Sequence, residues 1–284
     1  MLKGICWICV ITSKYVTDMI DKLSLTIYSP PDKTYLDTHG EVSEDTYRSH
    51  IYKLICRLDR AVVFYYPHKF SEGRNAKIPF TKIDLNPKYF ECYESMEAYI
   101  SSIFASPVDP EEFNVSRLDV AVDVEAFSID VLLSIMRIKN IRMDSLSFYK
   151  GTIYVGYNPK IRIYEKVKEI KERVKKGFEI TEYERGLLES GKSYTRFEIQ
   201  IRNVNKTLKE VAENPTGFST YYDRLEFFRF GDNGDSGILQ VLFKYINRKF
   251  RVELEKFRDR DMTMLIKEQF EAQVGDWFAP KEPF

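Results

Sequence analysis

The sequence predicts an α+β protein, with a largely antiparallel central sheet flanked by helices and a mostly helical C-terminal extension. Three observations predict this class. Apolar and polar residues alternate in many short segments, as in half-buried strands, whereas other segments repeat apolar residues at helical spacing. These strands and helices follow one another in a mixed order, and short turns join neighbouring strands. The chain has 284 residues, 44% of them hydrophobic and 14% aromatic, which is enough for a sizeable core.

The N-terminal part is predicted to combine strands with two helices. Alternation predicts strands at residues 22–28, 61–66 and 78–85. Helical spacing predicts helices at residues 47–58 and 95–104, and Ser43 is a suitable cap for the first. The Pro30-Pro31 pair ends the first strand, and residues 38–44 are polar, so we expect a loop there. A second, basic loop is predicted at residues 67–77.

The remaining chain continues the same mixture. Strands are predicted at residues 117–123, 148–149, 152–155, 160–166, 194–202 and 224–230, with turn residues at 156–159. Helices are predicted at residues 129–138, 167–174, 204–213, 238–250 and 252–270, and a capping box at residues 181–184 predicts one more. The Gly- and Asp-rich residues 231–237 indicate a boundary between a domain of residues 1–230 and a helical extension of residues 231–284.

The strand at residues 160–166 carries the most informative pattern. Its alternation places Arg162, Tyr164 and Lys166 on one face, so that one phenol lies between two cations. Positive charge beside a phenol stabilises the phenolate and also the charge that develops when a tyrosine attacks a phosphodiester. The alternative is a half-buried strand with a charged, solvated face, which is the ordinary role of most of the 19 tyrosines.

Two further strands carry acidic residues on a single face. Asp119 and Asp123 share a face with Arg117 in one strand, and Glu198 shares a face with Arg196 in the other. Carboxylates on neighbouring strands suit Mg²⁺ or Mn²⁺, since these ions bind a few carboxylates and take phosphate oxygens as further ligands. An isolated acid in a strand is more often solvated or salt-bridged, so this prediction depends on the three strands together.

The overall charge is uninformative, but its distribution is not. The chain has 43 Lys and Arg against 43 Asp and Glu. Residues 160–178, in contrast, contain eight basic residues and three glutamates. Basic groups beside the candidate tyrosine favour contact with a DNA backbone, although a charged helix face is usually only solvated surface. The residues predicted to contact DNA are Lys168, Lys171, Arg173, Lys175 and Arg196.

The spacing of the cysteines and histidines argues against a zinc site and against a metal site built on paired histidines. Cys6 and Cys9 have zinc-site spacing, but no second Cys or His pair completes a tetrahedral site. The three histidines lie far apart in the sequence, with no His-hydrophobic-His pair. No apolar run reaches the roughly 18 residues that a membrane helix requires, so we expect a cytoplasmic protein that does not bind membranes.

The middle of the chain, about residues 23–203, resembles the replication initiation factor (Rep_trans) family of rolling-circle initiators of small plasmids and phages. Its blocks are residues 117–123 (RLDVAVD), 151–156 with 161–166 (IRIYEK), and 194–199 (YTRFEI). The resemblance implies a DNA nicking and joining endonuclease with Tyr164 as nucleophile. The tyrosine would become linked to a 5′ phosphate, and Asp119, Glu198 and Asp123 would hold the metal, in that order of preference.

The resemblance also implies partners. We expect the protein to bind a replication origin as single-stranded or extruded DNA, to form a homodimer and to work with a host helicase. Three other functions fit the same residues. These are a relaxase that nicks the transfer origin of a mobile element, a DNA-binding regulator without catalysis, and a metal-dependent hydrolytic nuclease in which Tyr164 is structural.

Overall fold

The computed structural model describes residues 20–44, 51–68, 78–125, 136–138, 146–228 and 258–278. These residues form two compact units. Unit 1 comprises the described parts of Ala121–Ile199 and Thr216–Gln273, and unit 2 those of Val16–Val120, Gln200–Pro215 and Val274–Phe284. Several elements have one part in each unit, among them the strands β6 (Asn114–Glu125) and β11 (Tyr194–Arg202).

A ten-stranded sheet runs through the described residues in the order β2-β3-β4-β5-β1-β6-β11-β10-β9-β8. The pairs of this sheet from β2 to β6 and from β10 to β8 are antiparallel. A separate three-stranded antiparallel sheet has the order β13-β12-β7. The predicted α+β class with a largely antiparallel sheet is therefore confirmed.

Unit 2 contains the N-terminal strands and two α-helices that precede β6. Its elements are β1 (Ile20–Ile27), α1 (Lys33–His39), β2 (Glu41–Glu44), β3 (Tyr52–Arg57), β4 (Ala61–Pro67), β5 (Thr81–Leu85), η2 (Pro87–Tyr89), α2 (Tyr93–Ser102), η3 (Pro110–Glu112) and α6 (Leu208–Glu213). In β4 and β5, buried positions alternate with more exposed ones, as expected for strands with one core-facing side. In α2, Met96 and Ile100 are buried at i, i+4 spacing, as its apolar pattern predicts.

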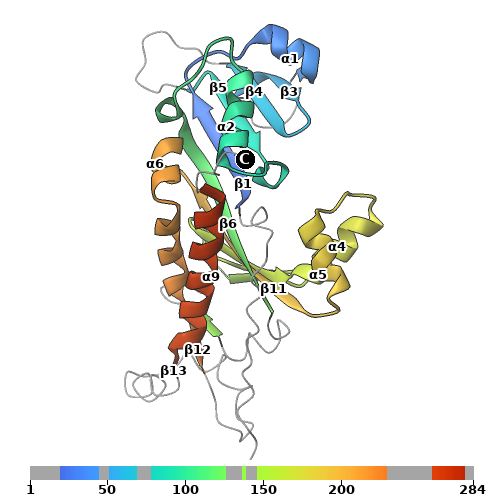
Figure 1. Ribbon diagram of the computed structural model, residues 1–284, viewed down its shortest axis with the longest axis vertical. Coiled ribbons are helices and arrows are strands. Elements are labelled where there is room, and N and C mark those ends of the chain that lie inside the picture. The colour runs from blue at the N-terminus through green and yellow to red at the C-terminus, as the bar shows by residue number, and fades with distance from the viewer. Residues whose placement is uncertain are drawn as a thin grey trace, which may run out of the picture. The chain divides into compact units, whose positions relative to one another are not determined.

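Unit 1 contains the candidate tyrosine. Its elements are β7 (Met136–Ile138), β8 (Leu146–Tyr149), β9 (Thr152–Val155), β10 (Lys160–Glu165), α4 (Lys166–Lys175), α5 (Glu182–Glu189), η5 (Pro215–Arg224), β12 (Leu225–Phe228), β13 (Arg258–Asp259) and the unit-1 part of α9 (Arg260–Phe278). Figure 1 shows α4 and α5 side by side, and they bury a shared cluster that includes Ile170 and Leu187. The expected capping box at Thr181 and Glu184 begins α5.

Three local predictions are wrong, and a fourth differs by one residue at its end. Part of the helix expected at residues 47–58 is strand β3, which pairs with β2 and β4, so non-local pairing outweighs its helical spacing. Part of the loop expected at residues 38–44 is β2, whose four residues are all exposed. Residues 136–138, expected to end a helix, form β7 and pair with β12. The strand expected at residues 160–166 ends at Glu165, and Lys166 begins α4.

Several expectations fall partly or wholly outside the described residues. They include the loop at residues 67–77, the helix at residues 238–250, the domain boundary after residue 230 and the Cys6–Cys9 pair. The helix expected at residues 252–270 is represented by α9, which begins at Arg260 and continues to Phe278, whereas Arg258 and Asp259 form β13 and pair with β12. None of the helices in the described part of the chain combines the length and the apolar character that a membrane span requires.

Candidate functional site

The strand β10 presents Tyr164 as its sequence predicts. Ile161 and Ile163 are buried on one face of the strand, and Arg162 and Tyr164 alternate with them. The Gly156–Pro159 turn connects β9 to β10, and Gly156 has a φ of 74°, a conformation that suits glycine. This hairpin pairs Arg162 with Tyr154 and Tyr164 with Thr152, which fixes the register of the tyrosine strand.

Tyr164, Arg162 and Glu198 form a cluster, here called the Tyr164 cluster. The Tyr164 hydroxyl donates a hydrogen bond to Glu198 Oε2 over 3.1 Å. Arg162 Nη1 donates to Glu198 Oε1 over 2.6 Å, and its Cζ lies 5.3 Å from the centre of the Tyr164 ring. One carboxylate therefore contacts both the phenol and the guanidinium, although 36 residues separate Arg162 from Glu198.

The electrostatics of this cluster favour a charged guanidinium. Burial opposes the charge of Arg162, but Glu198 and the nearby Tyr164 and Tyr154 outweigh burial and raise the pKa of Arg162. A permanent positive charge then lies over the Tyr164 ring and beside Glu198. Arg162 is therefore one of the two cations that the sequence pattern predicts beside Tyr164, while the Glu198 carboxylate adds negative charge next to the hydroxyl.

A cavity of about 370 Å³ opens beside the Tyr164 cluster. Tyr164 is part of its lining. Among the described residues, the lining combines basic side chains (Lys150, Arg162 and Lys168) with acidic ones (Glu165, Glu169 and Glu172). Tyr164 itself is only 7% exposed. The cavity therefore lies next to an otherwise buried phenol.

A second cluster, here called the Asp123 cluster, also combines a carboxylate, a guanidinium and a phenol. It shares the strand β11 with the Tyr164 cluster. Arg196 donates from Nε to Asp123 Oδ1 over 2.7 Å and from Nη2 to Oδ2 over 2.5 Å. The Tyr183 hydroxyl donates to Asp123 Oδ2 over 2.9 Å. Burial disfavours the carboxylate, but Arg196 outweighs burial and holds the pKa of Asp123 below its usual range. This bidentate pair is a core ion pair, since both side chains are 1% exposed.

Asp119 belongs to unit 2 and has its own partners there. Arg117 Nε donates to Asp119 Oδ1 over 2.8 Å, and Arg117 Nη2 donates to Asp119 Oδ2. Gln200 Nε2, in the same unit, also donates to Asp119 Oδ2, over 3.3 Å. Each of the three predicted metal-binding acids is therefore paired with an arginine.

The observed arrangement of these acids does not fit a divalent ion. All six oxygens of Asp119, Asp123 and Glu198 accept hydrogen bonds from side chains of the protein, and a guanidinium beside each carboxylate opposes a second cation. Among the residues that the structure describes, no three His, Cys, Asp or Glu side chains gather as ligands for a metal. Mn²⁺ or Mg²⁺ binding by these residues stays a prediction.

Lys166 takes a different place from the one its alternation predicts. As the first residue of α4 it is 3% exposed, and its Nζ contacts Glu184 over 3.1 Å and Glu169 over 3.0 Å. Burial disfavours the Glu184 carboxylate, but Lys166, the Thr181 backbone and Arg173 outweigh burial and lower the pKa of Glu184 to about 2. Lys166 thus joins α4 to α5 rather than lying beside the phenol.

The predicted DNA-binding residues divide into two groups. Lys168, Lys171 and Lys175 are exposed on α4, and Lys168 also lines the cavity beside Tyr164. Arg173 instead pairs with Glu184 and Glu169, and Arg196 is 1% exposed in the Asp123 cluster. The three lysines therefore offer their charge to solvent, whereas the two arginines hold acidic residues of the fold.

Sequence reasoning missed three residues that the structure brings to these clusters. Tyr183 completes the Asp123 cluster, Glu184 holds Lys166, and Tyr154 lies under both Lys160 and Arg162. Tyr154 lies opposite Arg162 because five residues separate the paired Val155 and Ile161, a register that only the structure shows. No local pattern marks Tyr183, whose partner is 60 residues away.

Comparison with known protein families finds a family model, Phage_CRI, that matches residues 56–216 and describes the N-terminal part of a replication-associated protein. The match covers more than half of the chain and includes all the candidate site residues on β6, β10, α4 and β11. Comparison with curated proteins and with solved structures finds no match.

The α+β fold and this match define the class as a rolling-circle replication initiator, as the sequence blocks predicted. More particularly, the chain belongs to the Phage_CRI family of replication-associated proteins. The match does not support the Rep_trans family specifically. A replication initiator binds DNA, so DNA is the expected partner.

Proposed function

We propose that this protein initiates rolling-circle replication of a plasmid or phage by nicking and rejoining one DNA strand through Tyr164. The observation that carries the proposal is the hydrogen bond from the Tyr164 hydroxyl to Glu198, beneath Arg162 and beside a cavity lined in part by lysines. A phenol with a carboxylate at 3.1 Å has a proton acceptor in reach, which is the geometry that nucleophilic catalysis requires.

The proposed reaction exchanges one phosphoester for another. As Tyr164 Oη forms a bond to phosphorus, its proton passes to Glu198, and the bond from phosphorus to the 3′ oxygen breaks. The departing oxygen takes a proton from water, which regains one from Glu198, and so becomes a free 3′-hydroxyl while the 5′ phosphate remains on the tyrosine. Arg162 stabilises the negative charge on the phenolate and on the phosphate oxygens. Rejoining reverses these steps, since the phosphotyrosine retains the free energy of the phosphodiester.

The role of a metal is a separate prediction. Mn²⁺ or Mg²⁺ would draw charge from the phosphate, but binding of the ion by Asp119, Glu198 and Asp123 would require these acids to release their arginine partners. The steps above need only side chains of the chain itself. A metal-dependent reaction is expected to form no adduct after exhaustive chelation and to recover in added Mn²⁺. A reaction that needs only side chains is expected to form the same amount of adduct in both conditions.

The partners proposed for this reaction follow from its substrate. The substrate is single-stranded or extruded origin DNA, and we expect Lys168, Lys171 and Lys175 to contact its phosphates near the cut. A homodimer, a host helicase and a cytoplasmic location are further predictions.

The test is a denaturing gel that detects a covalent protein–DNA adduct. The protein is incubated with Mn²⁺ and single-stranded oligonucleotides from its own replicon, each labelled at the end expected to remain on the tyrosine. The Tyr164→Phe variant is expected to form no adduct. Tyr183→Phe is the matched control, because it removes the same hydroxyl from the Asp123 cluster and is expected to leave adduct formation intact.

The alternative functions predict different gels. Cleavage without an adduct supports a hydrolytic nuclease, and binding without cleavage supports a regulator. An adduct that persists in Tyr164→Phe removes this tyrosine from the reaction. A relaxase would form the same adduct, but with oligonucleotides from a transfer origin instead of a replication origin.

A further inference from the structure

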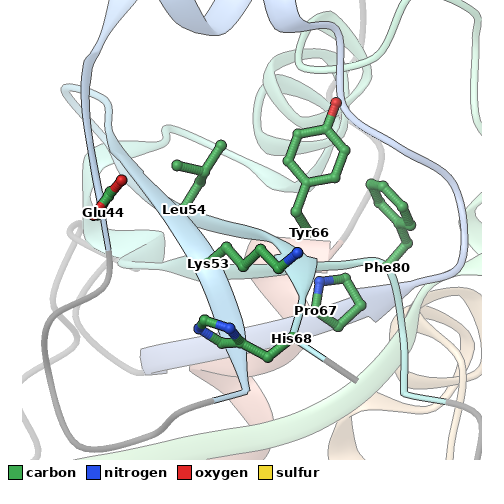
Figure 2. Close-up of a pocket in the computed structure, with 7 residues that line it drawn as sticks. All are labelled: Glu44, Lys53, Leu54, Tyr66, Pro67, His68 and Phe80. Atoms are coloured by element: carbon green, nitrogen blue, oxygen red, sulfur yellow. The ribbon is translucent and has the colours of Figure 1, made fainter. Parts of the chain in front are cut away.

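Unit 2 contains a second cavity, of about 490 Å³, that has no part in the proposed nicking reaction. It lies at one end of the β3–β4 pair, where Tyr52 is opposite Pro67 and His68 N–H donates to Ile51 O. Figure 2 shows its lining, which combines aromatic, aliphatic and charged side chains. The lining residues are Glu44, Lys53, Leu54, Tyr66, Pro67, His68 and Phe80.

Two aromatic rings form one side of this cavity. Tyr66 and Phe80 meet edge to face, with ring centres 5.1 Å apart. Tyr66 is 39% exposed, although it is a large aromatic residue next to the buried Tyr65. Its backbone has a φ of 55°, which is uncommon for a residue other than glycine and strained for a bulky one. An exposed ring held on a strained backbone is more typical of a binding site than of a packed core.

A basic side chain completes the cavity. Lys53 is exposed and has no hydrogen-bond or ion-pair partner among the described residues. Figure 2 shows its ammonium group directed toward the side of the cavity formed by Tyr66 and Phe80, while Glu44 lies at the other end. His68 adds an exposed imidazole to the same lining. An anion is therefore favoured beside Lys53 and disfavoured beside Glu44.

We propose that this cavity binds one nucleotide of a single-stranded DNA, with its base on the rings of Tyr66 and Phe80 and its phosphate on Lys53. A flat ring next to an exposed ammonium matches a base joined to a phosphate. The volume lies within the range of small-ligand sites, roughly 300–1,000 Å³. The choice of DNA as the nucleic acid rests on the proposed function, whereas the cavity and its residues do not.

Single-stranded binding is favoured over duplex binding by the shape of the site. Stacking on Tyr66 requires an unstacked base, and a paired base within a duplex does not expose its face. A site for one unpaired nucleotide in unit 2 gives the protein a contact to its DNA that is chemically independent of Tyr164.

The test measures equilibrium binding by the fluorescence anisotropy of labelled single-stranded oligonucleotides of mixed sequence. All proteins carry Tyr164→Phe, so that no adduct forms during the measurement. Tyr66→Asn is the main variant, because it removes the ring while asparagine tolerates the left-handed backbone. Tyr66→Phe retains the ring, and Tyr89→Ala is the control, since Tyr89 is 52% exposed in the same unit but does not line the cavity.

The expected result is a loss of affinity of about 5- to 150-fold in Tyr66→Asn, with little change in Tyr66→Phe or Tyr89→Ala. Lys53→Gln is expected to lower the slope of log K against log salt by about 0.7, the contribution of one phosphate on a single strand. Photocrosslinking with 5-iododeoxyuridine, read by mass spectrometry, is expected to label Tyr66 or Phe80. Equal affinity in Tyr66→Asn and the parent, or an equal loss in Tyr89→Ala, overturns the proposal.

The two proposals fail in different ways. An adduct in the chain with Tyr164 intact, together with unchanged binding in Tyr66→Asn, removes the nucleotide site and leaves the nicking reaction. Weaker binding in Tyr66→Asn, together with no adduct under any condition, leaves the nucleotide site and removes the reaction. Thermal unfolding of each variant tests whether it is folded at the temperature at which its affinity is measured.

Discussion

The Tyr164 cluster and the Asp123 cluster are built from the same three kinds of group, a carboxylate, a guanidinium and a phenol. The strand β11 contributes to both, since Arg196 and Glu198 are two residues apart. Their exposure differs, because the side chain of Arg162 is 33% exposed and that of Arg196 is 1% exposed. The Tyr164 cluster lines a cavity, whereas Arg196 and Asp123 are buried in the core. Access to a cavity, rather than the chemical groups alone, therefore distinguishes the candidate reactive site from the buried ion pair.

The largest expected difference between the two clusters is in reaction rate. Glu198→Gln removes the proposed proton acceptor and is expected to slow adduct formation by about 10²- to 10⁴-fold. Asp123→Asn, in the other cluster, is expected to leave the rate per folded molecule within a few-fold of the parent. Single-turnover adduct formation, normalised to the folded fraction, measures both, and a normal rate in Glu198→Gln would remove it as the base.

The converse difference is expected in stability. Arg196→Met leaves the fully buried Asp123 carboxylate without its partner, and the free energy of unfolding is expected to fall by about 3–5 kcal/mol. Arg162→Met also leaves a buried carboxylate, that of Glu198, without its guanidinium. It is expected to cost less, since a third of the Arg162 side chain meets solvent at the cavity and water can take its place there. Urea unfolding followed by circular dichroism measures both changes. If the two substitutions cost the same, the distinction between a buried and an accessible cluster is wrong.

A third prediction concerns pH and the ion pairs that join α4 to α5. The pKa of Glu184 is about 2 in the folded chain and about 4.5 when unperturbed, so its contribution to stability is present above pH 4.5. It is lost as the pH falls from about 4.5 to about 2, and it amounts to roughly 3 kcal/mol at most. Between pH 4.5 and pH 2, the free energy of unfolding of Glu184→Gln is expected to fall less steeply than that of the parent protein. An unchanged slope would mean that Glu184 titrates normally in the fold.

The smallest effects are expected on the exposed face of α4. Lys171→Gln and Lys175→Gln are each expected to change the free energy of unfolding by less than about 0.5 kcal/mol. Each is expected to lower the salt slope of single-stranded DNA binding by about 0.7, if the lysine contacts one phosphate. Filter binding over a range of salt concentrations measures this slope. An unchanged slope in both variants would show that this face of α4 does not contact the DNA.

Local patterns predicted many elements and their faces well. The alternation of β10 and β11 placed Tyr164, Arg162 and Glu198 on faces that meet, and Thr181 and Glu184 predicted the start of α5. Local patterns failed where a distant partner decides the structure. Residues 52–57 have apolar positions compatible with a helix, but pairing on both sides by β2 and β4 makes them a strand.

The sequence by itself determined which chemical groups are present and which face of each strand presents them, because side-chain direction follows from a two-residue period. Only the tertiary structure decided which arginine joins which acid. Arg196 was expected to contact DNA, yet it holds Asp123 from 73 residues away, and Lys166 was expected beside Tyr164, yet it holds Glu184. The physical reason is that a buried charge is stable only with a partner, and the partners meet through non-local packing that no local pattern records.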